Sequence, residues 1–203
     1  SLDVANLPPP APSGDVKFDQ LSLEQGLSQS TVATILQDSQ GFMWFGTQDG
    51  LNRYDGYAFK VFKHDSTDPT TLSDDAISAL FEDHLGELWV GTESGGLNRF
   101  NRESETFTSY RFDPDDPATI SSDSVKAIVE DQGGSLWLAT LNGLNRFDRT
   151  SLLFDHFPNR IYSDATEFRY NNIADLYLDP TGRLWLATAA GLLSFDPVDE
   201  SFG

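Results

Sequence analysis

Two arginines and two tyrosines occur within eleven residues of one irregular stretch of this sequence: Arg160, Tyr162, Arg169 and Tyr170. Guanidinium groups donate several hydrogen bonds in a fixed geometry and pair with carboxylates, and aromatic rings offer flat faces for stacking. These four residues are therefore candidates for binding a sugar or an acidic ligand. The simpler alternative is a long loop that packs over the rim of the fold.

A second group of candidates is polar and falls in short turns that we expect on the same face of the molecule as that stretch. Irregular loops on a rigid scaffold are common places for ligand binding. The group consists of Gln48, Asp49, Glu93 and Asn142.

Metal sites are less well supported. Several aspartates in two matching loops could supply oxygen ligands to Ca²⁺. Asp-Pro sequences also form ordinary turns, and we favour this second interpretation. They are Asp65, Asp68, Asp113, Asp115 and Asp116. The three histidines occupy unlike positions without metal-ligand spacing, and there is no cysteine. We expect no metal and no cofactor.

Sequence motifs for catalysis are missing from the chain. It contains no Gly-x-Ser-x-Gly elbow, no phosphate-binding loop and no His-Glu-x-x-His. Carboxylate pairs that could cleave glycosides are conceivable in so acidic a sequence, but none stands out. We therefore expect no catalytic residues, and a propeller glycoside hydrolase or lyase is the least favoured alternative.

The elements that must position these candidates are revealed by an internal repeat. Its four tryptophans lie 45, 48 and 48 residues apart, and each follows an Asp-x-x-Gly turn. The repeated positions are Trp44, Trp89, Trp137 and Trp185, with Asp38, Asp83, Asp131 and Asp179, and Gly41, Gly86, Gly134 and Gly182. A glycine-led segment such as Gly-Leu-Asn-Arg-Phe then follows. We interpret all of these repeated residues as structural.

Each unit is predicted to contain four short strands. The first strand is almost continuously apolar, which predicts burial on both faces. Four-stranded antiparallel sheets of this length, packed around an axis, describe an all-β propeller with about four blades, a partial ring. The tryptophans are expected to pack between blades. Arg53, Arg99 and Arg146 are expected to form structural hydrogen bonds or rim ion pairs.

The predicted boundaries follow from the repeat. Residues 1–14 are proline-rich and are expected to form a flexible leader to a propeller segment at 15–203. Residues 15–26 are predicted to be an orphan outer strand, and the blades are expected at about 27–71, 72–119, 120–171 and 172–203. Such a strand could close a ring of four blades or pair with a second copy.

The recurring run Asp-x-x-Gly-x-x-Trp-x-(Gly/Ala)-Thr-x-x-Gly-Leu-Asn-Arg-(Phe/Tyr)-Asp resembles the two-component regulator propeller repeat over residues 15–203. The fourth copy departs at Leu193 and Ser194. The resemblance implies the N-terminal part of a periplasmic sensor of a bacterial hybrid histidine kinase or diguanylate cyclase. It also implies a carbohydrate or other small ligand and a receptor dimer. A scaffold for protein–protein interaction without a small ligand is the alternative.

Charge excludes some partners. Thirteen Lys and Arg against 32 Asp and Glu give a net charge of −19. Nucleic-acid binding depends on neutralising phosphates, so we expect no nucleic-acid partner and no direct membrane contact in this segment.

Overall fold

The computed structural model describes residues 20–158 and 171–203, and within them sixteen strands form four antiparallel sheets. The first sheet contains β1 (Val32–Gln37), β2 (Met43–Thr47), β3 (Gly50–Tyr54) and β4 (Phe59–Phe62). The second contains β5 (Ile77–Glu82), β6 (Leu88–Thr92), β7 (Leu97–Asn101) and β8 (Thr106–Tyr110). The third contains β9 (Val125–Glu130), β10 (Leu136–Thr140), β11 (Gly143–Asp148) and β12 (Leu153–Phe157). The fourth contains β13 (Ile173–Leu178), β14 (Leu184–Thr188), β15 (Gly191–Asp196) and β16 (Ser201–Phe202).

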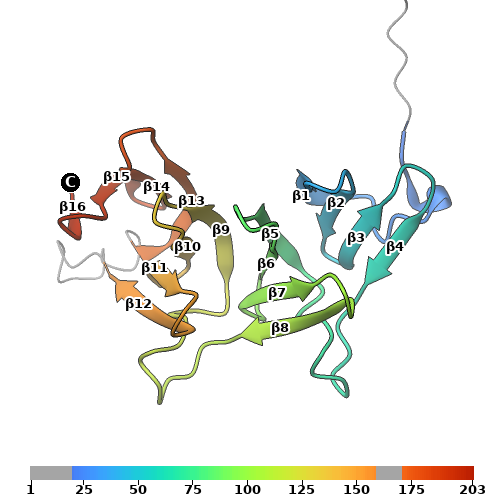
Figure 1. Cartoon of the computed structure of the whole chain (residues 1–203), viewed down its shortest axis with the longest axis horizontal. Coiled ribbons are helices and arrows are strands. Elements are labelled where there is room, and N and C mark those ends of the chain that lie inside the picture. Colours follow the sequence, from blue (N-terminus) through green and yellow to red (C-terminus); the bar gives the residue numbers. More distant parts are fainter. Residues whose placement is uncertain (1–19, 159–170) are drawn as a thin grey trace, which may run out of the picture.

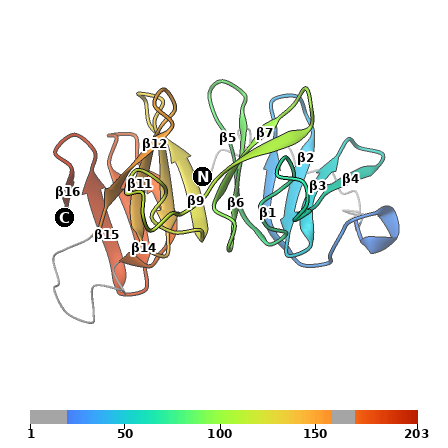
Figure 2. The same ribbon diagram turned by 90° about the horizontal axis from the view of Figure 1, so that it is seen from below.

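The sheets stand side by side in an open arc (Figures 1 and 2). In each sheet the strands are hydrogen-bonded in chain order, with β1, β5, β9 and β13 innermost and β4, β8, β12 and β16 outermost. The predicted all-β class and the four-stranded antiparallel blades are confirmed.

The Asp-x-x-Gly turns are held by their own tryptophans. Each turn glycine has a positive φ, between 78° and 91°, which glycine adopts without strain. Each turn aspartate accepts backbone hydrogen bonds through Oδ1, and through Oδ2 it accepts one from the indole Nε1 six residues later, at 2.7–2.9 Å. Burial raises the pKa of Asp38, but hydrogen bonds from Trp44 and Arg102 outweigh it and hold that pKa below its usual value.

The first three tryptophans pack between neighbouring sheets, as predicted. Trp44 contacts the ring of Phe100 in the second sheet, Trp89 contacts Phe147 in the third, and Trp137 contacts Phe195 in the fourth. All three indoles are buried. The prediction is wrong for Trp185, which is exposed because no fifth sheet covers it among the described residues.

The expectation that the first strand of each unit is buried on both faces is wrong for the end sheets. In β1 every second residue is exposed, and β13 also has exposed positions. In β5 and β9, which have a sheet on either side, every residue is at least half-buried. The second strands β6 and β10 are the most enclosed, with all five residues buried.

Two ionic clusters join the first three sheets at the Asp-x-x-Gly end. Arg102 in the β7–β8 turn donates to Asp38 of the preceding sheet at 2.7 Å and to Glu82 of its own sheet at 2.8 Å. Arg149 has a similar position: it donates to Glu130 of its own sheet at 2.5 Å and lies 3.2 Å from Asp83 of the preceding sheet, an ion pair without a hydrogen bond. We call these two clusters the arginine clamps. In the fourth sheet the matching positions are Leu178 and Pro197, so this sheet supplies no third clamp.

The arginines of the third strands form ion pairs both within and between sheets. Arg53 donates to Glu105 of the second sheet at 2.9 Å. Arg99 lies 3.6 Å from Glu87 of its own sheet. Arg146 donates to Asp155 of its own sheet at 2.7 Å and lies 3.2 Å from Glu200 of the fourth. Two of the three arginines therefore link neighbouring sheets.

Residues 20–26, the described part of the predicted outer strand, contain a 3₁₀ turn, η2 (Leu23–Gln25), with Ser22 as its N-cap. Residues 15–19 lie outside the described residues, as does the leader at 1–14.

Candidate functional site

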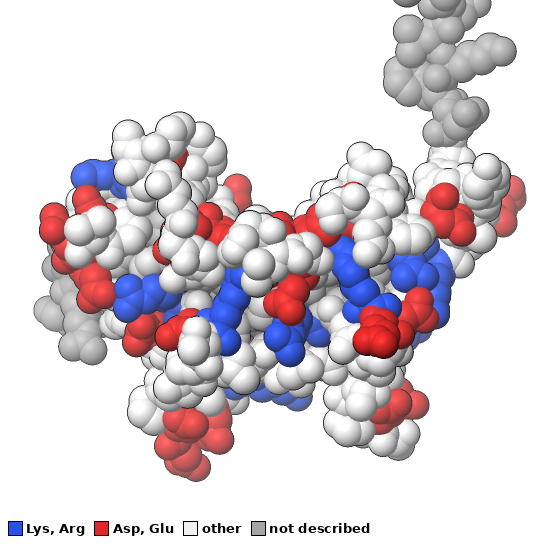
Figure 3. Space-filling view, viewed as in Figure 1, with Lys and Arg blue, Asp and Glu red and all other residues white. Residues whose placement is uncertain are grey.

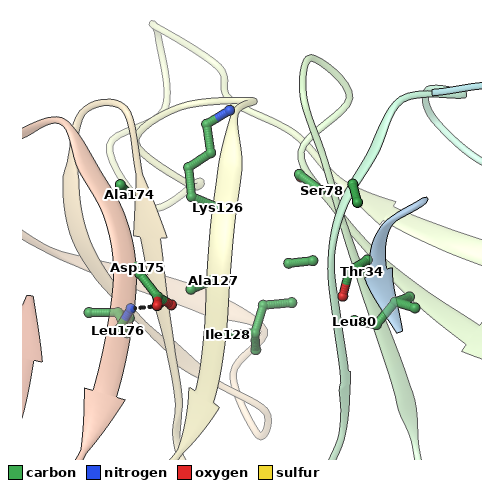
Figure 4. A pocket seen from close by; sticks show the side chains of 11 residues that line it. Thr34, Ser78, Leu80, Lys126, Ala127, Ile128, Ala174, Asp175 and Leu176 are labelled. Atoms are coloured by element: carbon green, nitrogen blue, oxygen red, sulfur yellow. Dashed lines mark hydrogen bonds between the residues drawn. The ribbon is translucent and has the colours of Figure 1, made fainter. Parts of the chain in front are cut away.

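The inner strands line an open central cavity of about 400 Å³ (Figure 4). All four sheets contribute to its lining. Four of the lining side chains are polar, Thr34, Ser78, Lys126 and Asp175, and the others are aliphatic. The surface exposed to the cavity is nevertheless mostly polar, so it differs from the predominantly apolar lining that is usual in small-molecule pockets.

A β-bulge near the start of each inner strand delivers one residue to this cavity. The pairing register skips one residue in every case, between Val32 and Thr34 in β1 and at the same place in β5, β9 and β13. A bulge re-aims side chains locally and is frequent beside binding sites. The skipped residues are Ala33, Ser78, Lys126 and Ala174, and all four line the cavity. We call them the bulge residues.

Lys126 is the cation among the described residues that line the cavity. Its ammonium group pairs with the carboxylate of Glu93, in the β6–β7 turn. The Ser78 hydroxyl already has a partner in the protein, because it donates to the Val125 carbonyl at 2.5 Å. Glu93 does not line the cavity itself but contacts a residue that does.

The other described candidates are not brought together. Asp49 pairs with Lys63 at 2.7 Å on the rim, and Gln48 beside it is exposed. The Asn142 side chain donates to the Ser121 carbonyl at 3.2 Å, so it holds the β8–β9 connection against the β10–β11 turn. Arg160, Tyr162, Arg169 and Tyr170 lie outside the described residues.

The predicted sharing of one face by the two sets of loops is confirmed. The backbone N–H of Gly50 donates to Asp75 O at 2.8 Å, and that of Gly96 donates to Asp123 O at 2.8 Å. Each bond joins a turn between a second and a third strand to the connection that enters the next sheet.

Asparagines of the third strands hold these connections in place. The side-chain oxygens of Asn52, Asn98 and Asn145 accept the backbone N–H of Ser28, Ser73 and Ser121, at 2.8–3.1 Å. In the fourth sheet the position is Leu193, which has no acceptor.

The aspartate-rich loops have local partners. Asp65 and Asp68 each accept from the backbone and hydroxyl of a threonine two residues later, and these bonds, led by the Thr67 N–H and the Thr70 hydroxyl, lower the pKa of both carboxyls. Asp113 and Asp116 accept backbone N–H groups in the same way. Among the described residues no group of three or more acidic or histidine side chains is arranged to hold a metal.

Acidic side chains gather on loops that project from the outer side of the arc (Figure 3). These are the connections between β4 and β5 and between β8 and β9. The negative charge is therefore concentrated away from the cavity.

Sequence reasoning missed the bulge residues. The available signal was variation at one position of otherwise similar repeats, where alanine, serine, lysine and alanine follow one another.

Comparison with known proteins then identifies the repeat. The family described as two component regulator propeller matches residues 26–49, 71–94 and 167–190. These three segments match the two-component regulator propeller repeat. A 63-residue part of the chain is 41% identical to "Histidine kinase P4" of Formosa agariphila and corresponds to 5% of that protein.

Similar solved structures include extracellular domains of signalling proteins of B. thetaiotaomicron. One is from a protein assigned as a hybrid two component system, with 25% identity, a TM-score of 0.69, and 91% of this chain and 31% of that chain covered. Another, from a protein assigned as a one component system, has 21% identity and a TM-score of 0.70, covering 87% of this chain and 24% of the other. The chain described here thus spans less than a third of either neighbour.

The fold is also shared with an enzyme. Virginiamycin B lyase from Staphylococcus aureus superposes with a TM-score of 0.67 at 15% identity, over 93% of this chain and 59% of the lyase. At that identity the likeness concerns the fold alone. Within residues 20–158 and 171–203, no helix has the length and apolar character needed to cross a membrane.

Proposed function

We propose that this propeller is the ligand-sensing part of an extracytoplasmic, periplasmic receptor of two-component type, and that it binds a saccharide at the mouth of the central cavity. The bulge residues carry this proposal. A bulge brings one residue of each inner strand to the same cavity, and these residues are alanine in two sheets, serine in one and lysine in one. A different side chain at equivalent places in one cavity is expected where the repeats serve a ligand.

The cavity has the groups that a saccharide needs. The Lys126 ammonium donates to hydroxyls or to the carboxylate of an acidic sugar, the Asp175 carboxylate accepts from hydroxyls, and Thr34 does both. Glu93 competes for Lys126 in the free protein, so an anionic ligand would exchange one charge partner for another.

A ligand held by all four inner strands could signal through the sheets. If it bound one spacing of the sheets better than another, it would shift the population towards that spacing. Kinase or diguanylate cyclase output would then belong to other parts of a longer receptor, which we expect to act as a dimer.

The proposal is tested with a panel of neutral and acidic oligosaccharides, measured by calorimetry and by thermal shift. A ligand that binds the native state raises the melting temperature. We expect at least one saccharide to bind, and Lys126→Ala to weaken it at least tenfold. Lys63→Ala removes a rim lysine that lies outside the cavity and should leave binding unchanged.

The second candidate function is a protein-interaction scaffold without a small ligand. No binding of any panel member would overturn saccharide sensing and favour the scaffold. Equal loss of binding in both lysine variants would place the ligand elsewhere.

A further inference from the structure

A second cavity, of about 660 Å³, lies between the third and fourth sheets at the Asp-x-x-Gly end of the molecule. The turns of both sheets line it through Asp131 and Gly182, together with Pro197 of the β15–β16 turn. It shares no lining residue with the central cavity. A ligand held here would therefore be separate from one held by the bulge residues.

The two interfaces before this one hold an arginine clamp at the same place. In the first clamp Arg102 donates to the Asp38 carboxylate at 2.7 Å and to the Gly86 carbonyl at 3.0 Å. The counterparts of these two acceptors are Asp131 and Gly182, and both line the cavity, whereas proline stands in place of the arginine. A site that the chain fills with its own guanidinium in two interfaces is thus left open in the third.

Asp131 differs from its counterparts as expected for an aspartate without a clamp. Asp38 and Asp83 are 4% and 5% exposed, because an arginine of the next sheet covers each, while Asp131 is only half-buried. The Oδ2 atom of Asp38 accepts from an indole and from a guanidinium. Among the described residues, that of Asp131 accepts only from the Trp137 indole, at 2.8 Å. A carboxylate oxygen accepts more than one hydrogen bond, so Asp131 retains an acceptor for a ligand.

The charge of the lining favours a cation. Asp131, Asp196 and Asp199 contribute carboxylates and Arg183 a guanidinium, an excess of two negative charges. Arg183 lies 3.5 Å from Asp196, so this cation pairs with the wall of the cavity rather than with the turn aspartate. Leu178 replaces the glutamate of the clamps, so the two further aspartates supply the negative charge that this position no longer provides.

We infer that this cavity, which we call the open clamp, binds a guanidinium group from outside the chain, carried by a small molecule or by an arginine side chain of a peptide. The group donates to the Asp131 carboxylate and the Gly182 carbonyl, in the geometry that suits a planar fork of N–H donors. It thereby bridges the third and fourth sheets. The inference does not depend on the saccharide proposal.

The test is a titration of the ¹⁵N-labelled protein followed by amide chemical shifts. The probes are agmatine and the peptide acetyl-Gly-Arg-Gly-amide, with the matching citrulline and lysine peptides as neutral and ammonium controls. We expect shifts at Asp131–Ser135 and Thr181–Arg183, and at least tenfold weaker binding of the citrulline peptide. The turns of Asp38 and Asp83 are internal controls, because their guanidinium positions are already filled. Tighter binding of agmatine would indicate a small ligand, and tighter binding of the arginine peptide would indicate a protein partner.

Variants test the site directly. Asp131→Asn should weaken the binding of both guanidinium probes at least tenfold, whereas Asp155→Asn removes the same charge outside the cavity and should leave it unchanged. The double variant Leu178→Glu/Pro197→Arg restores the clamp residues of the other interfaces. It should abolish probe binding and raise the melting temperature, a gain of stability that a misfolded variant would not show.

No shift with either guanidinium probe at the highest soluble concentration would overturn the inference. Equal binding of the arginine and lysine peptides, with shifts spread over the surface, would also overturn it, because a net charge of −19 attracts any cation. So would probe binding that survives Leu178→Glu/Pro197→Arg, since the ligand would then lie elsewhere. The saccharide proposal is tested at Lys126, so the two can fail separately.

Discussion

Trp137 and Trp185 have the same sequence neighbours and the same hydrogen bond to a turn aspartate, yet only Trp137 is enclosed by a following sheet. Their replacement by alanine therefore separates the hydrogen bond from the packing. We expect Trp137→Ala to reduce the free energy of unfolding by about 3–5 kcal/mol, as for other large buried side chains. Trp185→Ala should cost clearly less.

Both variants are best compared with the wild-type protein by urea denaturation. Equal losses would mean that the bond to aspartate, rather than packing between sheets, accounts for the stabilising effect of the tryptophan.

Asp38 should make the stability of the fold depend on pH. Its pKa is held below the ordinary value of 3.8, so the carboxyl of the unfolded chain takes up a proton at a higher pH than that of the folded chain. The stability that Asp38 contributes is complete above the ordinary value and is lost as the pH falls towards the folded value. Asp38→Asn should therefore lower the melting temperature at pH 7, by an amount that shrinks below pH 4.

The control for this measurement is Asp49→Asn, which removes an exposed carboxylate with a single lysine partner. It should change stability by less than about 1 kcal/mol. If Asp38→Asn lowered the melting temperature by the same amount from pH 7 to pH 3, the predicted coupling between stability and protonation of Asp38 would be contradicted.

For individual residues, the sequence predicts the structural positions better than it predicts the proposed ligand site. Asp38, Gly41 and Trp44 are recognisable because the same local bonds recur in every copy. Lys126 was missed because its place in the cavity depends on a one-residue bulge. A bulge is defined by the pairing register of two strands, which a single strand's sequence does not display.

The turns between third and fourth strands join neighbouring sheets through the arginine clamps. Arg102→Ala would leave the Asp38 and Glu82 carboxylates without their guanidinium and should cost about 1.5–3 kcal/mol. Arg111→Ala is the matched control, because Arg111 is exposed and pairs with Asp123 on the rim at 3.0 Å, a kind of pair that contributes at most about 1 kcal/mol. Thermal unfolding of both variants checks the difference, and similar losses would contradict a special role for the clamp.

Strand order and turn positions followed from the sequence because the tight turns have local signatures. Burial of the first strands did not follow, because it depends on the neighbours of the sheet. The apolar run Val32–Gln37 is half exposed in β1, whereas the similar run in β5 is enclosed by sheets on both sides. Ion pairs of Arg53 and Arg146 were expected, but the sequence did not show that Arg53 pairs with the next sheet or that Arg146 pairs with both its own sheet and the next.

Over the whole molecule the four sheets form a row in which each contacts only its neighbours. Stability in such arrays is the sum of the stabilities of the units and of their interfaces. The second and third sheets have two interfaces each, and the end sheets have one. The interface of the fourth sheet lacks a clamp, since Leu178 and Pro197 stand where Glu130 and Arg149 stand in the third sheet.

Amide hydrogen exchange should reveal this order. We expect the slowest exchange in β6 and β10, faster exchange in β2, and the fastest of the four second strands in β14. Local opening costs least where fewest interfaces must break. Uniform protection would instead mean that the arc opens as one unit.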